Sequence, residues 1–154
     1  MRVVVQRALS ASVSVEGEQV GSIGPGLAIL AGFTEGDTTE LAAGLARKVV
    51  ELRIFADSDG KMNRSVRDIG GEILAVSQFT LYGDTRRGRR PSFQAAARPA
   101  VATPLYEAFC DAVAATGITC ERGVFGAHMV LNITADGPVT IILDSEDLNR
   151  PRRT

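Results

Sequence analysis

The chain has 154 residues, a length that suits one domain, and 45% of them are hydrophobic, which is enough for a sizeable core. The formal net charge of −1 gives no indication of partners, and no stretch approaches the ~20 apolar residues of a membrane span. The start of the chain lacks the long apolar segment of a signal peptide. We therefore expect a soluble cytoplasmic protein that folds as a single domain over residues 1–154.

The first third of the chain is predicted to form an antiparallel meander. Residues 2–6 are a β-branched run, residues 11–15 alternate between apolar and polar side chains, and Gly17 marks a hairpin turn. A second turn at 24–26 leads into the apolar run 27–33, which is short enough for a buried strand.

An amphipathic helix is predicted at about residues 38–52. Asp37 is expected to cap its N-terminus, with Glu40 three residues further on, in the pattern of a capping box. Apolar side chains recur at helical spacing along one face, at Leu41, Leu45, Val49 and Leu52. This face should pack on the sheet.

Residues 53–55 are strand-like, and a polar segment follows at 57–61. That segment is similar to the start of a calcium-binding loop, but Asp68 stands where such a loop requires Glu. A solvated hairpin loop is therefore the preferred interpretation.

The apolar run 72–76, which follows two glycines, is predicted to be a buried strand. It ends in the polar pair Ser77 and Gln78, and polar residues at the end of a buried strand are a common position for chemistry. The segment 84–93 is expected to be a polar, arginine-rich loop.

A second helix is expected to begin between the prolines at 99 and 104 and to run to about Thr116, where Gly117 stops it. Its inner face would carry Leu105, Phe109 and Val113.

Strands return in the last third. Residues 119–122 form a short strand and 123–126 a turn. The alternating run 128–134 and the apolar run 139–143 are predicted to be separate strands, joined by a rigid corner at Gly137-Pro138. Together these elements predict one mixed α/β domain, mainly antiparallel, with two helices packed on the sheet.

No standard catalytic constellation is visible. His128 has no Cys or His close to it in sequence, so a structural role is the simpler interpretation and a general base the alternative. Cys110 and Cys120 match neither metal-ligand spacing nor a disulfide framework, and we expect buried thiols in a reducing compartment. Because no carboxylate pair and no glycine-rich phosphate loop has suitable spacing, we expect neither a metal nor a cofactor.

Hydroxyl and guanidinium groups remain as candidates. Thr80 either bonds to backbone at a strand end or belongs to a pocket floor, where the backbone N–H groups of Phe79 and Thr80 could face an oxyanion. An arginine cluster in the 84–93 loop is either solvated or binds the phosphates of a nucleic acid; it consists of Arg86, Arg87, Arg89 and Arg90. A second basic group near the C-terminus could act in the same way and consists of Arg150, Arg152 and Arg153.

Motifs along nearly the whole chain resemble the bacterial-type D-aminoacyl-tRNA deacylase family. They include MRVVVQR at 1–7, SQFTLYG at 77–83, GVFGAHM at 123–129 and DGPVT at 136–140. One departure is Ala135, where many relatives place Asn before the last motif, but both residues are small enough for a turn.

The resemblance implies a homodimer with active sites at the subunit interface, acting on aminoacyl-tRNA. It implies hydrolysis of the ester between a D-amino acid, or glycine, and the 3′-terminal adenosine. The implied catalytic pocket is formed by Ser77, Gln78, Phe79 and Thr80. The implied substrate-binding and chiral-selection residues are Gly137, Pro138, Phe125 and Met129, with a cis Gly-Pro peptide that enters the partner's pocket.

A rigid Gly-Pro corner suits chiral selection because its carbonyl oxygens can hold the substrate's α-ammonium group and leave no volume for an L side chain. A D side chain would point to solvent, and glycine would also be accepted. For the chemistry we favour water activated with help from the ribose 2′-hydroxyl, with backbone N–H groups on the oxyanion. The alternative makes the Thr80 hydroxyl a nucleophile.

Two functions of other classes compete with this one. A non-enzymatic RNA-binding dimer that uses the arginine loop would bind tRNA with a steep salt dependence and hydrolyse nothing. A small-molecule esterase with a Ser or Thr nucleophile would cleave activated esters without tRNA, although no base is evident near Ser77 or Thr80.

Overall fold

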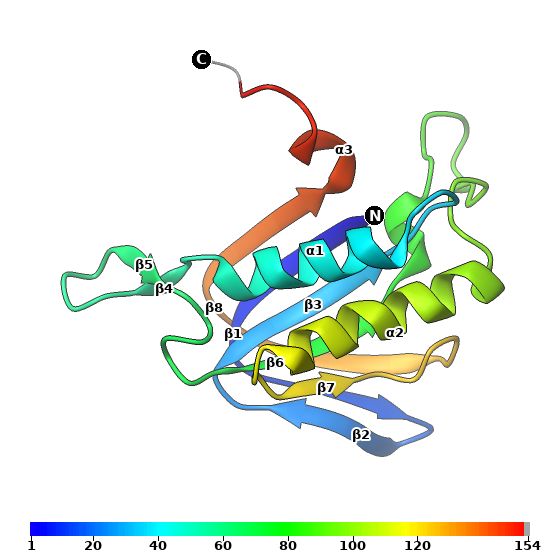
Figure 1. Cartoon of the computed structure of the whole chain (residues 1–154). Coiled ribbons are helices and arrows are strands. Elements are labelled where there is room, and N and C mark those ends of the chain that lie inside the picture. Colours follow the sequence, from blue (N-terminus) through cyan, green and yellow to red (C-terminus); the bar gives the residue numbers. More distant parts are fainter. Residues whose placement is uncertain (153–154) are drawn as a thin grey trace.

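The computed structural model describes residues 1–152 and consists of a curved sheet with two long helices on one face (Figure 1). Arg153, part of the basic C-terminal group, lies outside the described residues. No helix among the described residues is long and apolar enough to cross a membrane. The elements in chain order are β1 (Arg2–Val15), β2 (Glu18–Ile23), β3 (Gly26–Gly32), α1 (Thr39–Glu51), β4 (Phe55–Ala56), β5 (Met62–Arg64), β6 (Glu72–Ser77), the 3₁₀ helix η1 (Phe79–Tyr82), α2 (Pro99–Ala115), β7 (Cys120–Arg122), β8 (Met129–Asp144) and α3 (Ser145–Leu148).

The mixed α/β fold is confirmed, but the order of the strands differs from a meander. The sheet runs β2-β1-β3-β6-β7, and β8 pairs with β1. The predicted runs 2–6 and 11–15 belong to the single long strand β1, whose two halves pair with different strands, β3 and β2. Because β1 is long enough to serve both, it lies between them. The pairs β3–β6 and β6–β7 are parallel, and the three pairs of β1 are antiparallel.

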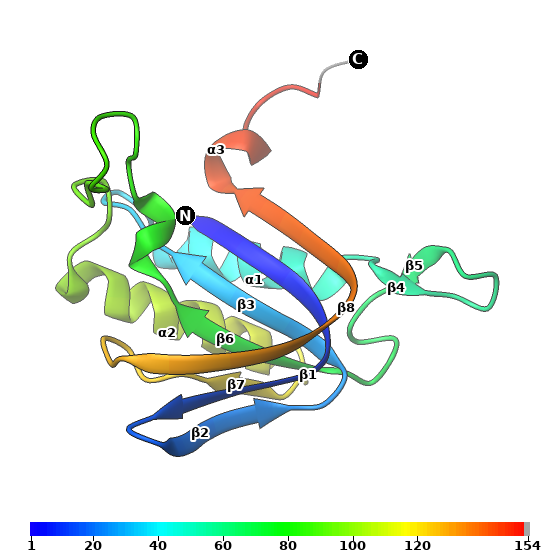
Figure 2. The same cartoon turned by 180° about the vertical axis from the view of Figure 1, so that it is seen from behind.

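The predicted division of the last strand is wrong. β8 is one strand of 16 residues that runs antiparallel to β1 along its length. Gly137-Pro138 interrupts the pairing register opposite residues 6–10 rather than ending one strand and starting another. β8 bends between its two halves but remains one strand, because it pairs with β1 on both sides of the interruption (Figure 2). Figure 2 shows the first half of β8 crossing the face of the sheet opposite the helices.

The N-cap of helix α1 lies one residue later than predicted, at Thr38 rather than Asp37. The Thr38 hydroxyl accepts the Leu41 N–H at 3.1 Å and caps the helix. Asp37 is not the cap: its carboxylate accepts the Thr34 N–H and the Met1 ammonium group, both at 2.9 Å. Both Asp and Thr are good capping residues, but the Asp37 carboxylate binds the buried ammonium group of Met1, so Thr38 caps the helix instead.

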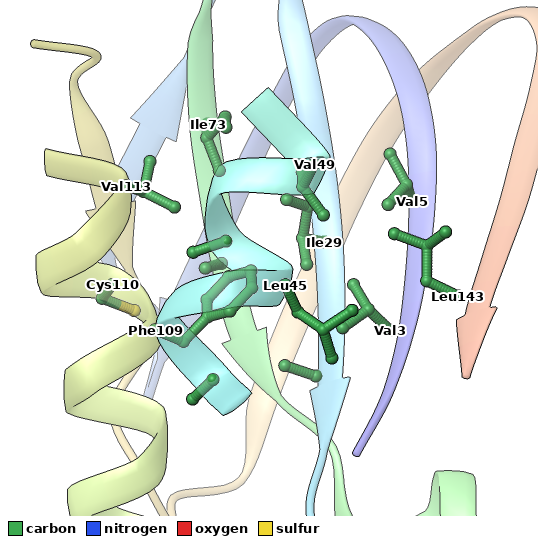
Figure 3. Close-up of a cluster of buried hydrophobic side chains, with 14 of the residues drawn as sticks. Val3, Val5, Ile29, Leu45, Val49, Ile73, Phe109, Cys110, Val113 and Leu143 are labelled. Atoms are coloured by element: carbon green, nitrogen blue, oxygen red, sulfur yellow. The ribbon is translucent and has the colours of Figure 1, made fainter. Parts of the chain in front are cut away.

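The main core lies between the helices and the sheet (Figure 3). Phe109 and Val113 of α2 and Leu45 and Val49 of α1 are buried there, as their helical spacing predicts. The segment 57–61 is a hairpin loop between β4 and β5, in which the Asp57 carboxylate accepts two backbone N–H groups. A smaller apolar cluster lies on the opposite face of the sheet, under the first half of β8.

Candidate active site

A cavity of about 570 Å³ opens at the carboxyl end of β6. Its walls come from the end of β6, the turn between β7 and β8, and the start of α2. Strands β3, β6 and β7 are parallel, and the carboxyl ends of parallel strands are the usual position of ligand sites in α/β sheets. The predicted site residues that line it are Ser77, Gln78, Phe79, Phe125 and Met129.

Thr80 does not line the cavity. It follows Phe79 in η1, is exposed, and its hydroxyl accepts a hydrogen bond from the Gln78 side-chain amide. No other residue described in the structure hydrogen-bonds to this hydroxyl, so no base contacts it. The arrangement fits an orienting contact within the motif better than an activated nucleophile.

The turn after β6 presents free backbone donors beside the cavity. The Gln78 N–H still belongs to the sheet, since it donates to the Ala31 carbonyl at 2.8 Å. Within residues 1–152, the N–H groups of Phe79 and Thr80 have no hydrogen-bond acceptor. They start η1, and the first N–H groups of a helix lack an intrahelical partner. Two adjacent free donors at a cavity can stabilise an oxyanion.

Small and apolar residues complete the cavity, and no pattern in the sequence indicated them. Ala97 and Ala102, near the start of α2, form part of one wall, and Phe33 of the loop after β3 forms another part. His128 also lines the cavity and is exposed, so its imidazole is open to solvent. A short apolar residue in a wall has no distinguishing pattern, because it looks the same as a core residue.

Tyr106 of α2 contacts two parts of the cavity wall, strand β6 and Phe125. Its hydroxyl is buried and donates to the Ala75 carbonyl of β6 at 2.8 Å. Its ring lies 6.1 Å from the ring of Phe125, centre to centre. Burial raises the pKa of the Tyr106 hydroxyl, which therefore stays protonated and keeps this bond. Next to it, Cys110 is buried as predicted, whereas Cys120 at the start of β7 is only half-buried.

Gly137 and Pro138 lie far from the cavity of their own chain. Seven residues lie between Met129 and Gly137 on the same strand. Arg7, which packs on Gly137, pairs with Leu27 at the start of β3, whereas the cavity opens where β3 and β6 end. The Gly137–Pro138 peptide bond is cis, and both residues are exposed. The structure therefore separates the two predicted halves of the site within one chain.

Arg7 of β1 holds the segment before Pro138. Its Nε donates to the Asp136 carbonyl at 3.2 Å and lies 3.3 Å from the Asp136 carboxylate. Another nitrogen of the same guanidinium group donates to the Ile54 carbonyl at 2.8 Å. A Cβ atom on Gly137 would lie only 3.1 Å from this group, so the guanidinium packs closely on the glycine backbone.

Comparison with known proteins supports the resemblance. A family model described as D-Tyr-tRNA(Tyr) deacylase matches residues 4–144. A D-aminoacyl-tRNA deacylase of Thermus aquaticus is 57% identical over 147 residues, covering 96% of this chain and 97% of the relative. One of Chloroflexus aurantiacus is 56% identical over 153 residues, covering 99% and 96%.

Two solved structures share the fold. The protein titled c-Myc DNA Unwinding Element Binding Protein has a TM-score of 0.87 and 41% identity, covering 94% of this chain and 99% of that one. A probable eukaryotic D-amino acid tRNA deacylase has a TM-score of 0.79 at 21% identity, covering 92% and 97%, which shows the fold alone. The chain belongs to the D-Tyr-tRNA(Tyr) deacylase family.

Proposed function

We propose that the protein is a cytoplasmic D-aminoacyl-tRNA deacylase, which hydrolyses the ester between a D-amino acid, or glycine, and the 3′-terminal adenosine of tRNA. It rejects the L ester and uses neither metal nor cofactor. The observation that carries the proposal is the pair of free N–H groups at Phe79 and Thr80, beside the cavity at the end of β6. Family membership supplies the substrate class.

The complete site needs a second copy of the chain. Gly137 and Pro138 are exposed and too far along β8 to reach their own cavity, so we assign them to the cavity of the partner in a homodimer. Val130 and Ile142, also on β8, are 56% and 66% exposed, and exposed apolar side chains on one strand favour a protein interface.

Chiral selection follows from what the Gly-Pro carbonyl oxygens can hold. They bind the substrate's α-ammonium group and fill the volume that an L side chain would need. A D side chain points away to solvent, which makes the enzyme tolerant of many D residues. Arg7 supports this role because it fixes the backbone immediately before Pro138.

Chemistry in this pocket relies on backbone and substrate rather than on a side-chain base. The ribose 2′-hydroxyl of the terminal adenosine helps activate the attacking water. The N–H groups of Phe79 and Thr80 stabilise the negative charge that develops on the ester oxygen, which is worth several kcal/mol in comparable sites, about 2.7–4 per donor. Phe125 and Met129 pack against the bound substrate.

The first experiment compares matched D-tyrosyl- and L-tyrosyl-tRNA with purified protein in the presence of a chelator. Loss of the D ester alone would support the activity, the chiral filter and metal independence. Binding of tRNA without cleavage of either ester would favour an RNA-binding module instead. Equal cleavage of both esters would leave a hydrolase but refute the role of Gly137 and Pro138.

A further inference from the structure

The arginine-rich loop between η1 and α2 is a closed hairpin. Asp84 and Ser92 exchange two backbone hydrogen bonds, of 2.7 and 2.9 Å, at its base. Gly88 near its tip has a positive φ of 67°, a conformation that glycine adopts readily. The loop therefore has a defined shape although its side chains are exposed.

Arg86 is bound within the loop itself. Its Nε lies 2.9 and 3.1 Å from the two carboxylate oxygens of Asp84, and its terminal nitrogen lies 2.7 Å from one of them. The Arg86 backbone N–H also donates to that carboxylate at 3.0 Å. These contacts lower the pKa of Asp84 to about 2, so the carboxylate is ionised at neutral pH. Most exposed ion pairs contribute little to stability, but a bidentate arginine–carboxylate pair has the geometry in which such a pair does contribute.

The other three arginines of the loop are free. Arg87, Arg89 and Arg90 are exposed, and none forms an ion pair or donates a side-chain hydrogen bond within residues 1–152. Because Asp84 balances Arg86, the uncompensated positive charge of the loop comes from these three residues. A polar groove beside the ion pair, lined by Arg87 and Gln94 among others, is open to solvent.

The loop lies next to the mouth of the cavity. Phe93, which follows the loop directly, lines the cavity and packs edge-on against Phe79, with the ring centres 5.1 Å apart. The base of the loop therefore lies at the cavity, and an anion bound along the loop would lie on the same side of the molecule as the reacting ester. In a tRNA, the anions nearest to that ester are the phosphodiester groups of the single-stranded 3′ end.

We propose that Arg87, Arg89 and Arg90 bind the phosphates of the single-stranded 3′ end of tRNA, while Arg86 is a positioning residue that braces the loop through Asp84. This inference rests on the proposed tRNA substrate. It divides the arginine cluster predicted from the sequence into three phosphate contacts and one internal ion pair.

Binding of uncharged tRNA across a series of salt concentrations tests the division. Each phosphate contact to a single strand contributes about 0.7 to the slope of log K against log salt. We expect Arg87→Gln, Arg89→Gln and Arg90→Gln each to flatten the slope by about that amount. The charge-neutral double variant Asp84→Asn/Arg86→Gln should keep the wild-type slope, because the three phosphate contacts remain, but should bind more weakly at every salt concentration, because the loop loses its brace. Arg47→Gln, which removes an exposed arginine of α1, is the matched control and should also keep it.

Several outcomes would overturn the proposal. One is a loss of slope in the Asp84→Asn/Arg86→Gln variant equal to that in Arg87→Gln, because Arg86 would then be a phosphate contact. Another is an unchanged slope in all three single variants. Circular dichroism and thermal unfolding of each variant establish that it folds, so a lost slope reports on binding.

A kinetic comparison locates the contact on the substrate. D-tyrosyl-adenosine carries the ester without any phosphodiester group, so Arg87→Gln should lower kcat/KM on D-tyrosyl-tRNA and leave it unchanged on the adenosine ester. Equal losses on both substrates would contradict the proposal. The salt series uses no ester, so a failure of the proposed hydrolysis and a failure of the phosphate contacts are distinguished.

Discussion

Arg7 and Asp136 are joined by two contacts of one guanidinium nitrogen: the Arg7 Nε lies 3.2 Å from the Asp136 carbonyl oxygen and 3.3 Å from its carboxylate. Asp136 directly precedes the Gly137-Pro138 pair. The arginine comes from β1 and the aspartate from β8, so this side-chain contact joins the two strands where their backbone pairing is interrupted and holds the proposed chiral filter in place.

Replacing Arg7 should weaken chiral selection more than it weakens hydrolysis. Arg7→Gln leaves the Ile54 and Asp136 carbonyls without their donor, which we expect to cost about 1–3 kcal/mol of stability. It should also let the Gly-Pro segment move, so that the ratio of D-tyrosyl- to L-tyrosyl-tRNA cleavage falls at least tenfold. Arg53→Gln is the matched control, because Arg53 also donates to a carbonyl, that of Asn63. A variant that loses stability but keeps the full D/L ratio would refute this role for Arg7.

Removing the Thr80 hydroxyl should leave much of the activity. That hydroxyl accepts from Gln78 and has no base beside it among the described residues, while the proposed donors are backbone N–H groups. We expect Thr80→Ala to lower kcat on D-tyrosyl-tRNA by less than about tenfold, since one hydrogen bond contributes about 1 kcal/mol. Abolished turnover in a folded protein, measured under single-turnover conditions, would favour Thr80 as the nucleophile.

The cross-subunit site can be tested with mixed dimers. Ala127→Trp should block the cavity while leaving Gly137-Pro138 intact, and Pro138→Ala should leave the cavity open with a defective filter. The first homodimer should be inactive, and the second should cleave both D and L esters. In a co-expressed mixed dimer, the open cavity receives the intact filter, so cleavage becomes specific for the D ester. Persistent L-ester cleavage by the purified mixed dimer would show that each chain filters for itself.

Two glycines should respond to alanine in opposite directions. A Cβ on Gly26 would lie 1.8 Å from the Glu72 carbonyl oxygen, its partner across the parallel pair β3–β6. Gly26→Ala should therefore cost more than about 3 kcal/mol, as severe overpacking does. Gly44 lies within α1 with the nearest atom 4.0 Å from its Cβ position, and Gly44→Ala should stabilise the protein by ~0.5–1 kcal/mol. Urea unfolding of both variants measures the difference, and equal effects would contradict the packing described.

Stability should fall at alkaline pH, in part through Tyr106. Burial raises the pKa of this hydroxyl above its unfolded value near 10, so the folded state keeps a proton that the unfolded state releases. Stability is therefore complete below about pH 10 and is lost as the pH rises above it, at about 1.4 kcal/mol per pH unit for this one proton. Tyr106→Phe should reduce that slope by the same amount, at a cost of about 0.5–1.5 kcal/mol near neutral pH, because the Ala75 carbonyl loses one of its two donors and keeps the Gly123 N–H. Urea unfolding at several pH values checks both effects, and an unchanged slope would exclude Tyr106 as the source.

Local patterns predicted the elements well where a periodicity or a punctuating residue was present. Phe109 and Val113 are buried at helical spacing, and Gly117, with a φ of 91°, follows α2 as expected. The order of the strands in the sheet was harder to predict. Nothing within residues 2–15 indicates that the two halves of β1 pair with different strands.

The candidate site was only partly visible in the sequence for a related reason. Ser77 and Gln78 stand out as polar residues at the end of a buried strand, and the structure places both at the cavity. Ala97 and Ala102 have no such signature. The distance between Met129 and Gly137 became evident only when residues 128–143 proved to be part of one strand rather than two strands around a corner.

β8 carries a cavity residue near one end and the Gly-Pro pair near its middle, so in the proposed homodimer it would act as a ruler between two sites on different molecules. A deletion of two residues between Met129 and Asp136 would preserve the alternation of side chains, yet shorten the ruler by about 7 Å. The protein would keep its pattern of buried and exposed positions and still present its filter to the wrong part of the neighbouring subunit. The number of residues between Met129 and Asp136 would therefore matter for function even where the identity of those residues does not.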